Sequence, residues 1–417
     1  MTRTTRYTTL FAVATALLAG GCLSPDGVYL TYNDHDTSRS IVINWMSHGR
    51  GEASEVYYDT TSHGGDRDAY AMQASGERRA LLGKETRFVH SVALSGLEPG
   101  TDYFVVAGNR DDGYSREFKF RTLPNDGSPV RLIVGGDQGP TFTARQLLSE
   151  ASQYEPHAVV IGGDIAYANG EPGNLAVWDA WFWNYRHRME TPDGYTVPLM
   201  LAIGNHEIND VEGSPEEMAP WFYGLFNQAD TPYFTRSAGP HTTLFFLDTG
   251  HTHDHEGAQR EWLAAALDEY DDVPNKLAVY HEGLFPSYRP FEKSAAERAR
   301  KAWQPLFDAH GLDLGFEHHD HTFKRTKPII GNEVDEDGTV YLGDGSFGIG
   351  TRPIRNGDLW YMEEASPTPH FWVIDLKPGH IQARAVDRTG DVFDEYEQID
   401  DAELAGDTAR AATASAE

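Results

Sequence analysis

The stretch GGDIAY, residues 162–167, decides how the rest of this sequence is interpreted. It follows AVVI, residues 158–161, a short apolar run that predicts a buried strand ended by two glycines. A carboxylate (Asp164) and a phenol (Tyr167) therefore stand three residues apart where a strand ends. In α/β sheets, ligands bind in the crevice outside the carboxyl ends of the strands. We therefore expect Asp164 to belong to a binding site.

Length and charge limit the possible functions. A chain of 417 residues can bury a full core and is expected to hold two domains. Its formal net charge of −30 and its isoelectric point near 4.9 argue against non-specific nucleic-acid binding. An acidic surface does not exclude anionic substrates, because a bound metal can dominate the charge of its own site. We therefore expect no nucleic-acid partner.

The first 22 residues have the composition of an export signal. Arg3 and Arg6 form a basic start, and residues 10–18 form an apolar segment of the usual length. Cys22, the single cysteine of the sequence, follows at the expected cleavage point, and the segment resembles a bacterial lipoprotein signal. Simple cleavage after a small residue is the alternative. We expect either a secreted protein or a cell-envelope lipoprotein (outer membrane, periplasm or surface) that meets a membrane only through a lipid on Cys22.

Residues 27–122 are predicted to form an all-β domain. Short runs of β-branched and aromatic residues alternate with turn residues there, and no helical periodicity interrupts them. The spacing is typical of a β-sandwich. Residues 94–103 (LSGLEPGTDY) resemble a corner of fibronectin type III domains, where a leucine fills the core and a tyrosine begins the next strand. The predicted strands span 41–45, 55–58, 88–94, 103–107 and 117–121.

A linker of turn-forming residues (123–129) separates this part from a region with alternating strands and helices. The alternation predicts an α/β domain over 130–398, with central β-sheets flanked by helices. A tail rich in alanine, threonine and acids (399–417) is expected to be disordered. The predicted strands span 131–134, 158–161, 197–203, 242–247, 276–280, 312–316, 339–342, 370–376, 381–385 and 392–396, and the predicted helices 143–154, 174–189, 257–270 and 294–310.

Five segments of the α/β part share one pattern, in which an apolar run is followed by a break and then by a side chain able to bind metal. Each segment alone has an ordinary structural explanation, because Asp and Asn after a strand often cap a helix or form a turn. Five such segments in one domain, all at predicted strand ends, favour a shared metal site instead. The segments are 135–139 (GGDQG), 163–167 (GDIAY), 203–207 (IGNHE), 278–281 (AVYH) and 318–321 (HHDH).

Together the five segments resemble the motifs of the purple acid phosphatases, a group within the calcineurin-like metallophosphoesterase superfamily. Those motifs are Asp-x-Gly, Gly-Asp-x-x-Tyr, Gly-Asn-His-(Asp/Glu), Val-x-x-His and Gly-His-x-His, and they cover about 137–321 here. Tyr167 is the specific part, because other calcineurin-like phosphoesterases lack this tyrosine and carry a histidine where Gly139 stands. A fibronectin-like domain precedes the catalytic domain in plant and many bacterial members. The resemblance implies a bacterial purple acid phosphatase with both domains.

The resemblance also implies a dinuclear metal centre. Phenolate and carboxylate are hard oxygen donors that suit Fe(III), whereas imidazole and amide ligands suit a divalent Zn, Fe or Mn ion. The Asp164 carboxylate can bridge, because both of its oxygens have spare lone pairs. Two metals about 3.5–4 Å apart can clamp both a nucleophile and a phosphate oxygen. The implied ligands are Asp137, Asp164, Tyr167 and His321 for one metal, and Asp164, Asn205, His281 and His319 for the other.

The implied reaction is hydrolysis of small-molecule phosphate monoesters, or of diesters, by attack of a metal-bound hydroxide at phosphorus. In the family, the histidine of the Asn-His pair contacts the phosphate or protonates the leaving group. His206 is therefore the expected catalytic residue with Asp164, and Asn205 and His206 are expected to bind substrate. A His206 that only orients a ligand is the alternative. The sequence also leaves open a phosphodiesterase or alkaline phosphatase with similar metals, and a non-catalytic cell-surface binding protein.

Four features have no settled role in the sequence. His318 stands where the family has glycine, and could be an exposed neighbour, a competing ligand or a sign of a different bend. Glu282 places an acid directly after His281. The alternating histidines of 251–255 (HTHDH) could form a second metal cluster, although a solvated turn is the commoner explanation. The aromatic helix 174–189 could line a pocket or belong to the core. Substrate identity and oligomeric state stay open.

Overall fold

The protein was analysed as a computed structural model that describes residues 27–49, 51–81, 86–355 and 359–399. The predicted export signal, with Cys22, lies outside these residues, as does the predicted tail from residue 400 onward. In the described part of the chain, no helix combines the length and the apolar character needed to span a membrane.

The N-terminal part consists of two packed β-sheets. Its core lies between them and includes Trp45, Val92, Val105 and Phe120, all buried. One sheet contains β1 (Tyr29–Thr31), β2 (Ser40–Ser47), β6 (Phe88–Ser95) and β5 (Glu77–Ala80), and the other contains β4 (Met72–Ser75), β3 (Glu55–Asp59), β7 (Asp102–Asn109), β8 (Gly113–Tyr114) and β9 (Phe118–Arg121). A 3₁₀ turn spans Arg67–Ala69. The sequence patterns missed β1, β4, β5 and β8, which are short or half-exposed.

The corner predicted at 94–103 forms in the structure, with a buried leucine and a hydrogen-bonded tyrosine. Leu97 is buried, and the Glu98 N–H donates to the Tyr103 hydroxyl oxygen at 2.9 Å. A tyrosine at a strand start that hydrogen-bonds to main chain a few residues upstream characterises the tyrosine corner of β-sandwiches. The kinship with fibronectin type III domains stays a prediction.

One ten-stranded sheet runs through both halves of the chain. β1 of the N-terminal part lies parallel to β12, with Thr31 opposite Leu199. β10, β11 and β12 are parallel neighbours, and β22 returns antiparallel to β10. The order is β24 (Val392–Ile399), β23 (His380–Asp387), β22 (His370–Lys377), β10 (Val130–Gly135), β11 (Ala158–Gly162), β12 (Leu199–Ala202), β1, β2, β6 and β5.

A second, seven-stranded sheet packs against the first. Its central strands β14, β15, β16 and β20 are parallel, and its edges are antiparallel. The order is β13 (Phe234–Ser237), β14 (Thr242–Phe246), β15 (Asn275–Glu282), β16 (Leu314–His318), β20 (Val340–Gly343), β17 (Phe323–Thr326) and β21 (Met362–Ser366). A small hairpin joins β18 (Ile329–Ile330) and β19 (Glu333–Val334).

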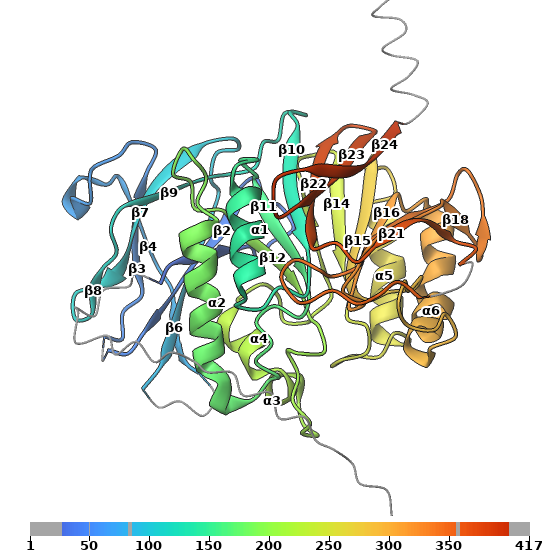
Figure 1. Cartoon of the computed structure of the whole chain (residues 1–417). Coiled ribbons are helices and arrows are strands. Elements are labelled where there is room, and N and C mark those ends of the chain that lie inside the picture. The colour runs from blue at the N-terminus through green and yellow to red at the C-terminus, as the bar shows by residue number, and fades with distance from the viewer. Residues whose placement is uncertain (1–26, 50, 82–85, 356–358, 400–417) are drawn as a thin grey trace, which may run out of the picture.

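Helices cover the outer faces of the two sheets, which gives four layers (Figure 1). In β11, Ala158 and Val160 face the second sheet, whereas Val159 and Ile161 pack with the helices. Both faces are buried, and this is why the strand is a continuous apolar run. α1 (Phe142–Ser152) and α2 (Leu175–Arg188) lie on the ten-stranded sheet, and α5 (Ala258–Glu269) and α6 (Ser294–His310) on the seven-stranded sheet.

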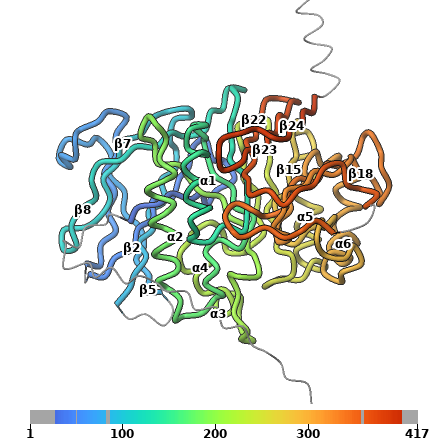
Figure 2. The backbone as a smooth tube through the Cα atoms, in the orientation of Figure 1, coloured from blue at the N-terminus to red at the C-terminus, as the bar shows by residue number. Residues whose placement is uncertain are grey.

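Shorter elements complete the fold. They are the helices α3 (Pro215–Met218) and α4 (Pro220–Leu225) and a 3₁₀ turn at Pro172–Asn174. The chain finally returns to the middle of the molecule, where β22 lies beside β10 near α1 (Figure 2).

The aromatic side chains of α2 belong mainly to the core. Trp178, Trp181 and Tyr185 are buried in one cluster with residues of α4, whereas Trp183 is 43% exposed and stacks on His187. Of the two roles that the sequence left open for this helix, the structure supports core packing. Trp181 also reaches the predicted metal site indirectly, because its Nε1 donates to Gln138 Oε1 at 2.6 Å.

Candidate metal centre

The carboxyl ends of parallel strands from both sheets meet at one place. The predicted ligands follow β10, β11 and β12 in the ten-stranded sheet, and lie at the ends of β15 and β16 in the seven-stranded sheet. Main-chain contacts connect the loops: the Asp137 N–H donates to the Gly163 carbonyl (3.1 Å), and His281 Nδ1 lies 3.0 Å from the Gly162 carbonyl oxygen. Buried strands thus hold these loops in fixed positions.

Asp137, Tyr167 and His321 form a first group. Tyr167 Oη donates to Asp137 Oδ1 (2.8 Å) and lies 3.1 Å from His321 Nε2, which is 2.9 Å from the same carboxylate oxygen. Gly139 lies next to the tyrosine, since a Cβ there would be in ordinary contact with Tyr167 Cδ2 at 3.5 Å. Two oxygens and one nitrogen therefore converge, as the ligands of one ion would.

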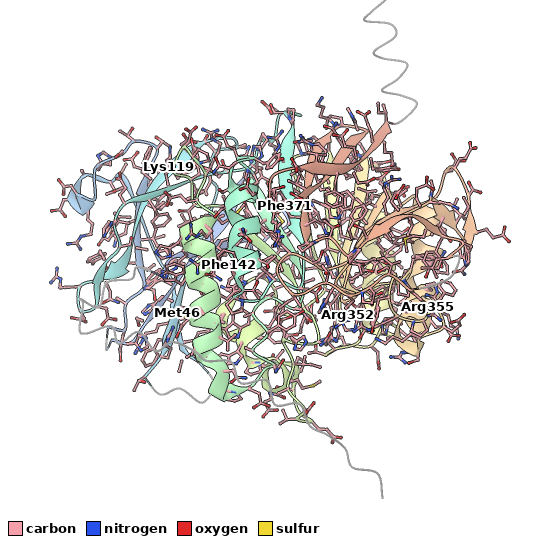
Figure 3. The ribbon with its side chains drawn as sticks, in the orientation of Figure 1. Met46, Lys119, Phe142, Arg352, Arg355 and Phe371 are labelled. Atoms are coloured by element: carbon pink, nitrogen blue, oxygen red, sulfur yellow. The ribbon has the colours of Figure 1, made fainter. Side chains whose placement is uncertain are left out.

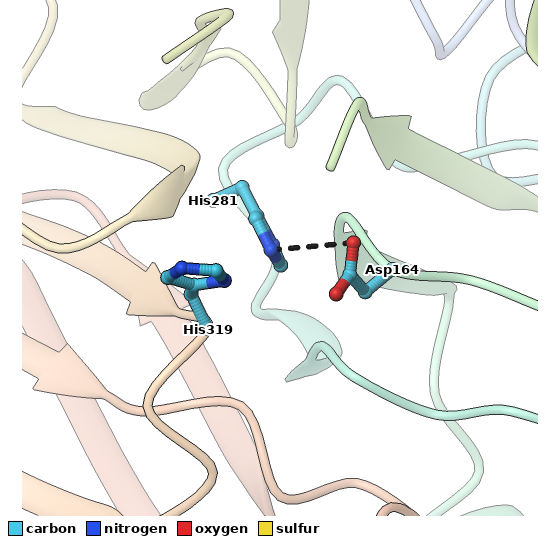
Figure 4. A group of neighbouring side chains, drawn as sticks. All are labelled: Asp164, His281 and His319. Carbon is cyan, nitrogen blue, oxygen red and sulfur yellow. Dashed lines mark ion pairs between the residues drawn. The ribbon is translucent and has the colours of Figure 1, made fainter. Parts of the chain in front are cut away.

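Asp164, Asn205, His281 and His319 form a second group. His281 Nε2 lies 3.3 Å from Asp164 Oδ1 and 3.1 Å from Asn205 Oδ1. Ligand atoms of Asp164, His281 and His319 lie within 4.8 Å of one another (Figure 4). Among the His, Cys, Asp and Glu side chains of the described residues, this is the one set of three placed closely enough to hold an ion. The structure therefore brings together all seven predicted ligands in two adjacent groups.

Five of the predicted ligands have a left-handed main-chain conformation. The φ angle is +57° at Asp137, +52° at Asp164, +62° at Tyr167, +76° at His319 and +58° at His321. Non-glycine residues rarely adopt such angles, and only eight of the described ones do so here. Strained conformations that the surrounding structure enforces cluster at functional sites. The bends turn these side chains toward a common point.

The charges of the site fit metal cations. Burial, and then the carboxylates of Asp137 and Asp164, raise the pKa of the Tyr167 phenol far above its usual value. Asp164 Oδ1 accepts the His206 N–H (2.7 Å), but Oδ2 is buried without a hydrogen-bond partner. An orphaned buried carboxylate oxygen is costly. A cation beside it would satisfy that oxygen and offset the mutual repulsion of the acidic groups.

The histidines fit the same conclusion. Burial, and then the charge of His281, lower the pKa of His319, so its imidazole is neutral and able to bind metal. Burial also lowers the pKa of His281, but the carboxylates of Asp164 and Asp137 raise it more, to about 10. A metal ion would take the place of the proton that these carboxylates otherwise favour.

Glu207 connects the loops without binding metal itself. Its buried carboxylate accepts the main-chain N–H groups of Asp164 (2.7 Å), Ile165 (2.8 Å) and Gly204 (2.9 Å). Burial, and then the Asp164 carboxylate, raise the pKa of Glu207 to about 8. The residue ties the loop after β11 to the loop after β12, a role that the sequence pattern did not indicate.

His206 lies beside both groups and is partly open to solvent. Its ring is 4.1 Å from that of Tyr167, its Nε2 is 3.8 Å from Asp164 Oδ2, and its side chain is 34% exposed. Nδ1 is hydrogen-bonded to Asn169, so Nε2 is the ring nitrogen on the side of the Asp164 carboxylate. None of the sequence motifs indicated Asn169, although a polar residue before a glycine, two positions after Tyr167, was a usable signal.

His318 is buried, and it belongs to neither of the two groups of predicted ligands. It is 2% exposed, and both of its ring nitrogens lack a hydrogen-bond partner. Its ring occupies the space that two glycines leave, since a Cβ on Gly136 would lie 2.7 Å from His318 Cγ and one on Gly162 1.8 Å from Nε2. His318 therefore packs between the two sheets, behind the predicted metal site.

Glu282 faces the site rather than open solvent. Its Oε1 lies 3.8 Å from His319 Nε2, and its Oε2 accepts Lys293 Nζ at 2.6 Å. Burial raises its pKa, but the hydrogen bond and charge of Lys293, together with the charges of His251 and His281, lower it more, so the acid is ionised.

The loop of His251, His253 and His255 is not a second metal cluster among the described residues. His251 is buried with its ring 5.7 Å from that of His281, whereas His255 packs 5.1 Å from the Trp303 ring. The ring of His253 lies 5.3 Å from that of Tyr233, so the three histidine rings have different neighbours. Asp248 holds the loop by accepting the N–H groups of His251, Thr252 and His253.

Comparisons with known proteins show which families and relatives the chain resembles. Residues 25–122 match the family described as purple acid phosphatase, N-terminal domain, and residues 130–323 match the calcineurin-like phosphoesterases. Purple acid phosphatase 15 of Arabidopsis thaliana is 28% identical over 295 residues, which cover 64% of this chain and 55% of that relative. Purple acid phosphatase 21 of the same plant is 25% identical over 374 residues, which cover 87% of this chain and 76% of that relative.

A solved structure shares the fold. Purple acid phosphatase PPD1 from yellow lupin (Lupinus luteus) seeds superposes with a TM-score of 0.75 at 18% identity, over 91% of this chain and 75% of that one.

These findings indicate the class of enzyme that the chain resembles. A region that matches the purple acid phosphatase N-terminal domain precedes a region that matches the calcineurin-like phosphoesterases, and together with the relatives they indicate a phosphoester hydrolase. The predicted fold class, a β-rich N-terminal domain followed by an α/β metallophosphoesterase domain, is confirmed. Its named relatives are plant purple acid phosphatases, so the non-catalytic binding protein has no support. The bacterial origin stays a prediction.

Proposed function

We propose that this protein is an exported dinuclear metallophosphatase of the purple acid phosphatase type, which hydrolyses phosphate monoesters. The observation that supports this most directly is the environment of Asp164. Its carboxylate is buried beside both groups of ligands, with Oδ1 near His281 and Oδ2 without a hydrogen-bond partner. A carboxylate with two available oxygens can serve two cations.

The proposed metals follow from the donor atoms. The Asp137, Tyr167 and His321 group, with Asp164, offers mainly hard oxygens and would hold Fe(III). The Asn205, His281 and His319 group, with Asp164, would hold a divalent Zn, Fe or Mn ion. When bound, such a pair supplies Lewis-acid stabilisation of the phosphate and lowers the pKa of water at the site.

The chain's own residues then position the substrate. His206 Nδ1 is fixed by Asn169, and Nε2 lies 3.8 Å from Asp164 Oδ2 on a side chain that is 34% exposed, so Nε2 can hydrogen-bond a phosphate or the departing oxygen at the metal ligands. Asn205 lies next to it and contacts His281. Buried Glu207 holds the main chain that carries these residues, so the geometry exists before substrate binds.

Metal analysis of the purified protein tests the centre. We expect about two metal ions per chain, one of them iron, and a colour from phenolate-to-iron charge transfer. Tyr167→Phe should lose the colour, because the phenolate is the absorbing ligand. A colourless, active, iron-free enzyme would contradict the ferric assignment.

A substrate panel tests the reaction. We expect p-nitrophenyl phosphate to be hydrolysed faster than bis(p-nitrophenyl) phosphate, with an optimum below neutral pH. His206→Ala should lower kcat about 100-fold, whereas the exposed His187→Ala serves as the matched control. Preference for the diester would indicate a phosphodiesterase, and an optimum well above pH 7 an alkaline phosphatase.

Export and lipidation rest on the sequence of residues 1–22. We expect the full chain, produced in a bacterium, to incorporate labelled palmitate and to fractionate with membranes. Cys22→Ser should abolish the label while leaving phosphatase activity intact. An unlabelled wild-type protein in the medium would support simple secretion instead.

A further inference from the structure

Of three cationic side chains beside the loop after β16, two have a carboxylate partner and one does not. Arg289 pairs with Asp320 at 2.5 Å, and Lys293 pairs with Glu282 at 2.6 Å. Arg352, within the described residues, has no carboxylate within 4.0 Å. The chain carries 64 acidic and 34 basic side chains, so an arginine without an acidic partner is not explained by a shortage of acids.

Arg352 is nevertheless held firmly. Its Nη1 donates to the His319 carbonyl oxygen (3.0 Å), and its main-chain N–H donates to the His321 carbonyl oxygen (3.0 Å). His321 Nδ1 in turn lies 3.3 Å from the Gly350 carbonyl oxygen. The loop at 350–352 thus runs along the main chain that carries one predicted ligand of each metal.

The position of the guanidinium indicates what it can bind. It contacts the carbonyl of His319, so it is anchored to the main chain of a predicted metal ligand and leaves the imidazole of that ligand free for a metal. Only one of its five N–H donors has a protein partner in the described structure, and the fork of an arginine matches two oxygens of a phosphoryl group. The Tyr288 ring, 41% exposed and 5.4 Å from the guanidinium, offers an apolar surface next to it.

We infer that Arg352 is a substrate-binding residue that recognises a second phosphoryl group on the leaving portion of the substrate. The carbon part of that leaving group packs on Tyr288, and the scissile phosphate lies at the metals. The inference rests on the proposed phosphatase function and adds its substrate class: phosphomonoesters that carry at least two phosphoryl groups.

Binding of two non-hydrolysable probes tests this role separately from catalysis. Calorimetry on the metal-loaded full chain compares propylphosphonate with propane-1,3-bisphosphonate. We expect the wild type to bind the bisphosphonate about tenfold more tightly or better, from the charge-assisted contact to Arg352. Arg352→Ala should abolish that difference and change propylphosphonate affinity less than about threefold, and Arg352→Lys should keep part of it.

A neighbour in the same loop provides the control. Arg355 is exposed, and its main-chain N–H donates to the Ser287 carbonyl oxygen. It is labelled with Arg352 in Figure 3. Arg355→Ala should bind both probes as the wild type does. High salt should reduce the preference of the wild type, because exposed charges are screened.

Kinetics provide the second measurement. With the monophosphate and bisphosphate of propane-1,3-diol, Arg352→Ala should raise KM for the bisphosphate about tenfold and change kcat little. Equal affinity of the wild type for both probes would overturn the inference. If Arg352→Ala loses affinity equally for both probes, or loses metal, the inference is also overturned. Either result would mean that Arg352 only stabilises the conformation of the loop that carries His319. A wild type that hydrolyses no phosphoester overturns the proposed function, while the probe comparison still decides the role of Arg352.

Discussion

The two sheets contribute different kinds of atom to the candidate metal centre. The ten-stranded sheet supplies only oxygen donors, and the seven-stranded sheet supplies only imidazole nitrogens. The oxygen donors are Asp137, Asp164, Tyr167 and Asn205, and the nitrogen donors are His281, His319 and His321. Because each group of ligands takes atoms from both sheets, neither sheet could hold a metal alone. A bound metal pair would therefore stabilise the packing of one sheet on the other.

Direct contacts between the sheets already prepare this arrangement. The His319 N–H donates to Asp137 Oδ2 (2.9 Å), and His281 Nδ1 meets the Gly162 carbonyl oxygen (3.0 Å). His318 occupies the space over Gly136 and Gly162. The site thus depends on glycines that carry no chemistry, because only they let the sheets approach closely.

Asp164→Asn should break this arrangement most severely. It removes the negative charge and replaces one of the two carboxylate oxygens with an amide NH2 group that cannot bind a cation. We therefore expect loss of both metals and a fall in kcat/KM of more than about 100-fold, which exceeds the roughly 10- to 100-fold cost of losing a partner outside the ligand set. Metal content and steady-state kinetics measure the effect. Asp193→Asn, at an exposed position, should behave as the wild type. Retention of a full dinuclear centre would show that Asp164 does not bridge.

Metal removal should weaken the packing of the two sheets. At free metal about 1,000-fold above its Kd, a ligand that binds only the folded state adds about 4 kcal/mol to the free energy of unfolding. Denaturant unfolding before and after chelation measures the difference. The Asp164→Asn protein should show little response to the chelator. An equal response in both proteins would mean that metal stabilises the chain elsewhere.

Gly162→Ala should disturb the contact between the sheets without touching a ligand. The added Cβ would lie 1.8 Å from His318 Nε2, and overpacking of this kind costs about 1–3 kcal/mol of unfolding free energy. Gly173→Ala is the control, because a Cβ there meets nothing within 4 Å. His318→Gly in the same chain should restore part of the loss, and a double-mutant cycle measures that coupling. Strict additivity would exclude the clash as the cause.

Protonation of a histidine in the ten-stranded sheet, far from the predicted metals, should have the smallest effect on the free energy of unfolding. His90 is buried on Trp45, and its two ring nitrogens meet the hydroxyls of Ser47 (2.9 Å) and Ser54 (2.8 Å). Burial lowers its pKa from 6.5 to about 4. Below pH 6.5 the unfolded chain therefore binds more protons than the folded one. The free energy of unfolding consequently decreases as the pH is lowered.

The expected loss is about 1–2 kcal/mol of unfolding free energy between about pH 6.5 and pH 5. Denaturant unfolding across this range measures it, and His90→Gln should flatten the slope. An unchanged slope in the variant would show that other groups control the acid sensitivity of this sheet.

Local patterns were sufficient for the main elements of the fold. The predicted helix 294–310 has the bounds of α6, since its apolar face repeats regularly and Gly311 ends it with φ +59°. The predicted strand 158–161 lies within β11. β1 was missed because three residues carry no periodicity, and its role is to continue the sheet from Leu199 across to the N-terminal part. Such a pairing depends on residues far apart in the chain.

The sequence by itself determined the donor types and their order along the chain. Each of the motifs with Asp164, Asn205 and His281 is a local signal, because a ligand must follow a strand that positions it. Only the tertiary structure decided which side chains surround those donors. Glu207 ties two loops, His318 fills a gap between sheets, and Arg352 contacts a carbonyl 33 positions earlier. Those contacts join residues from different strands and loops, and they exist only after the two sheets have packed.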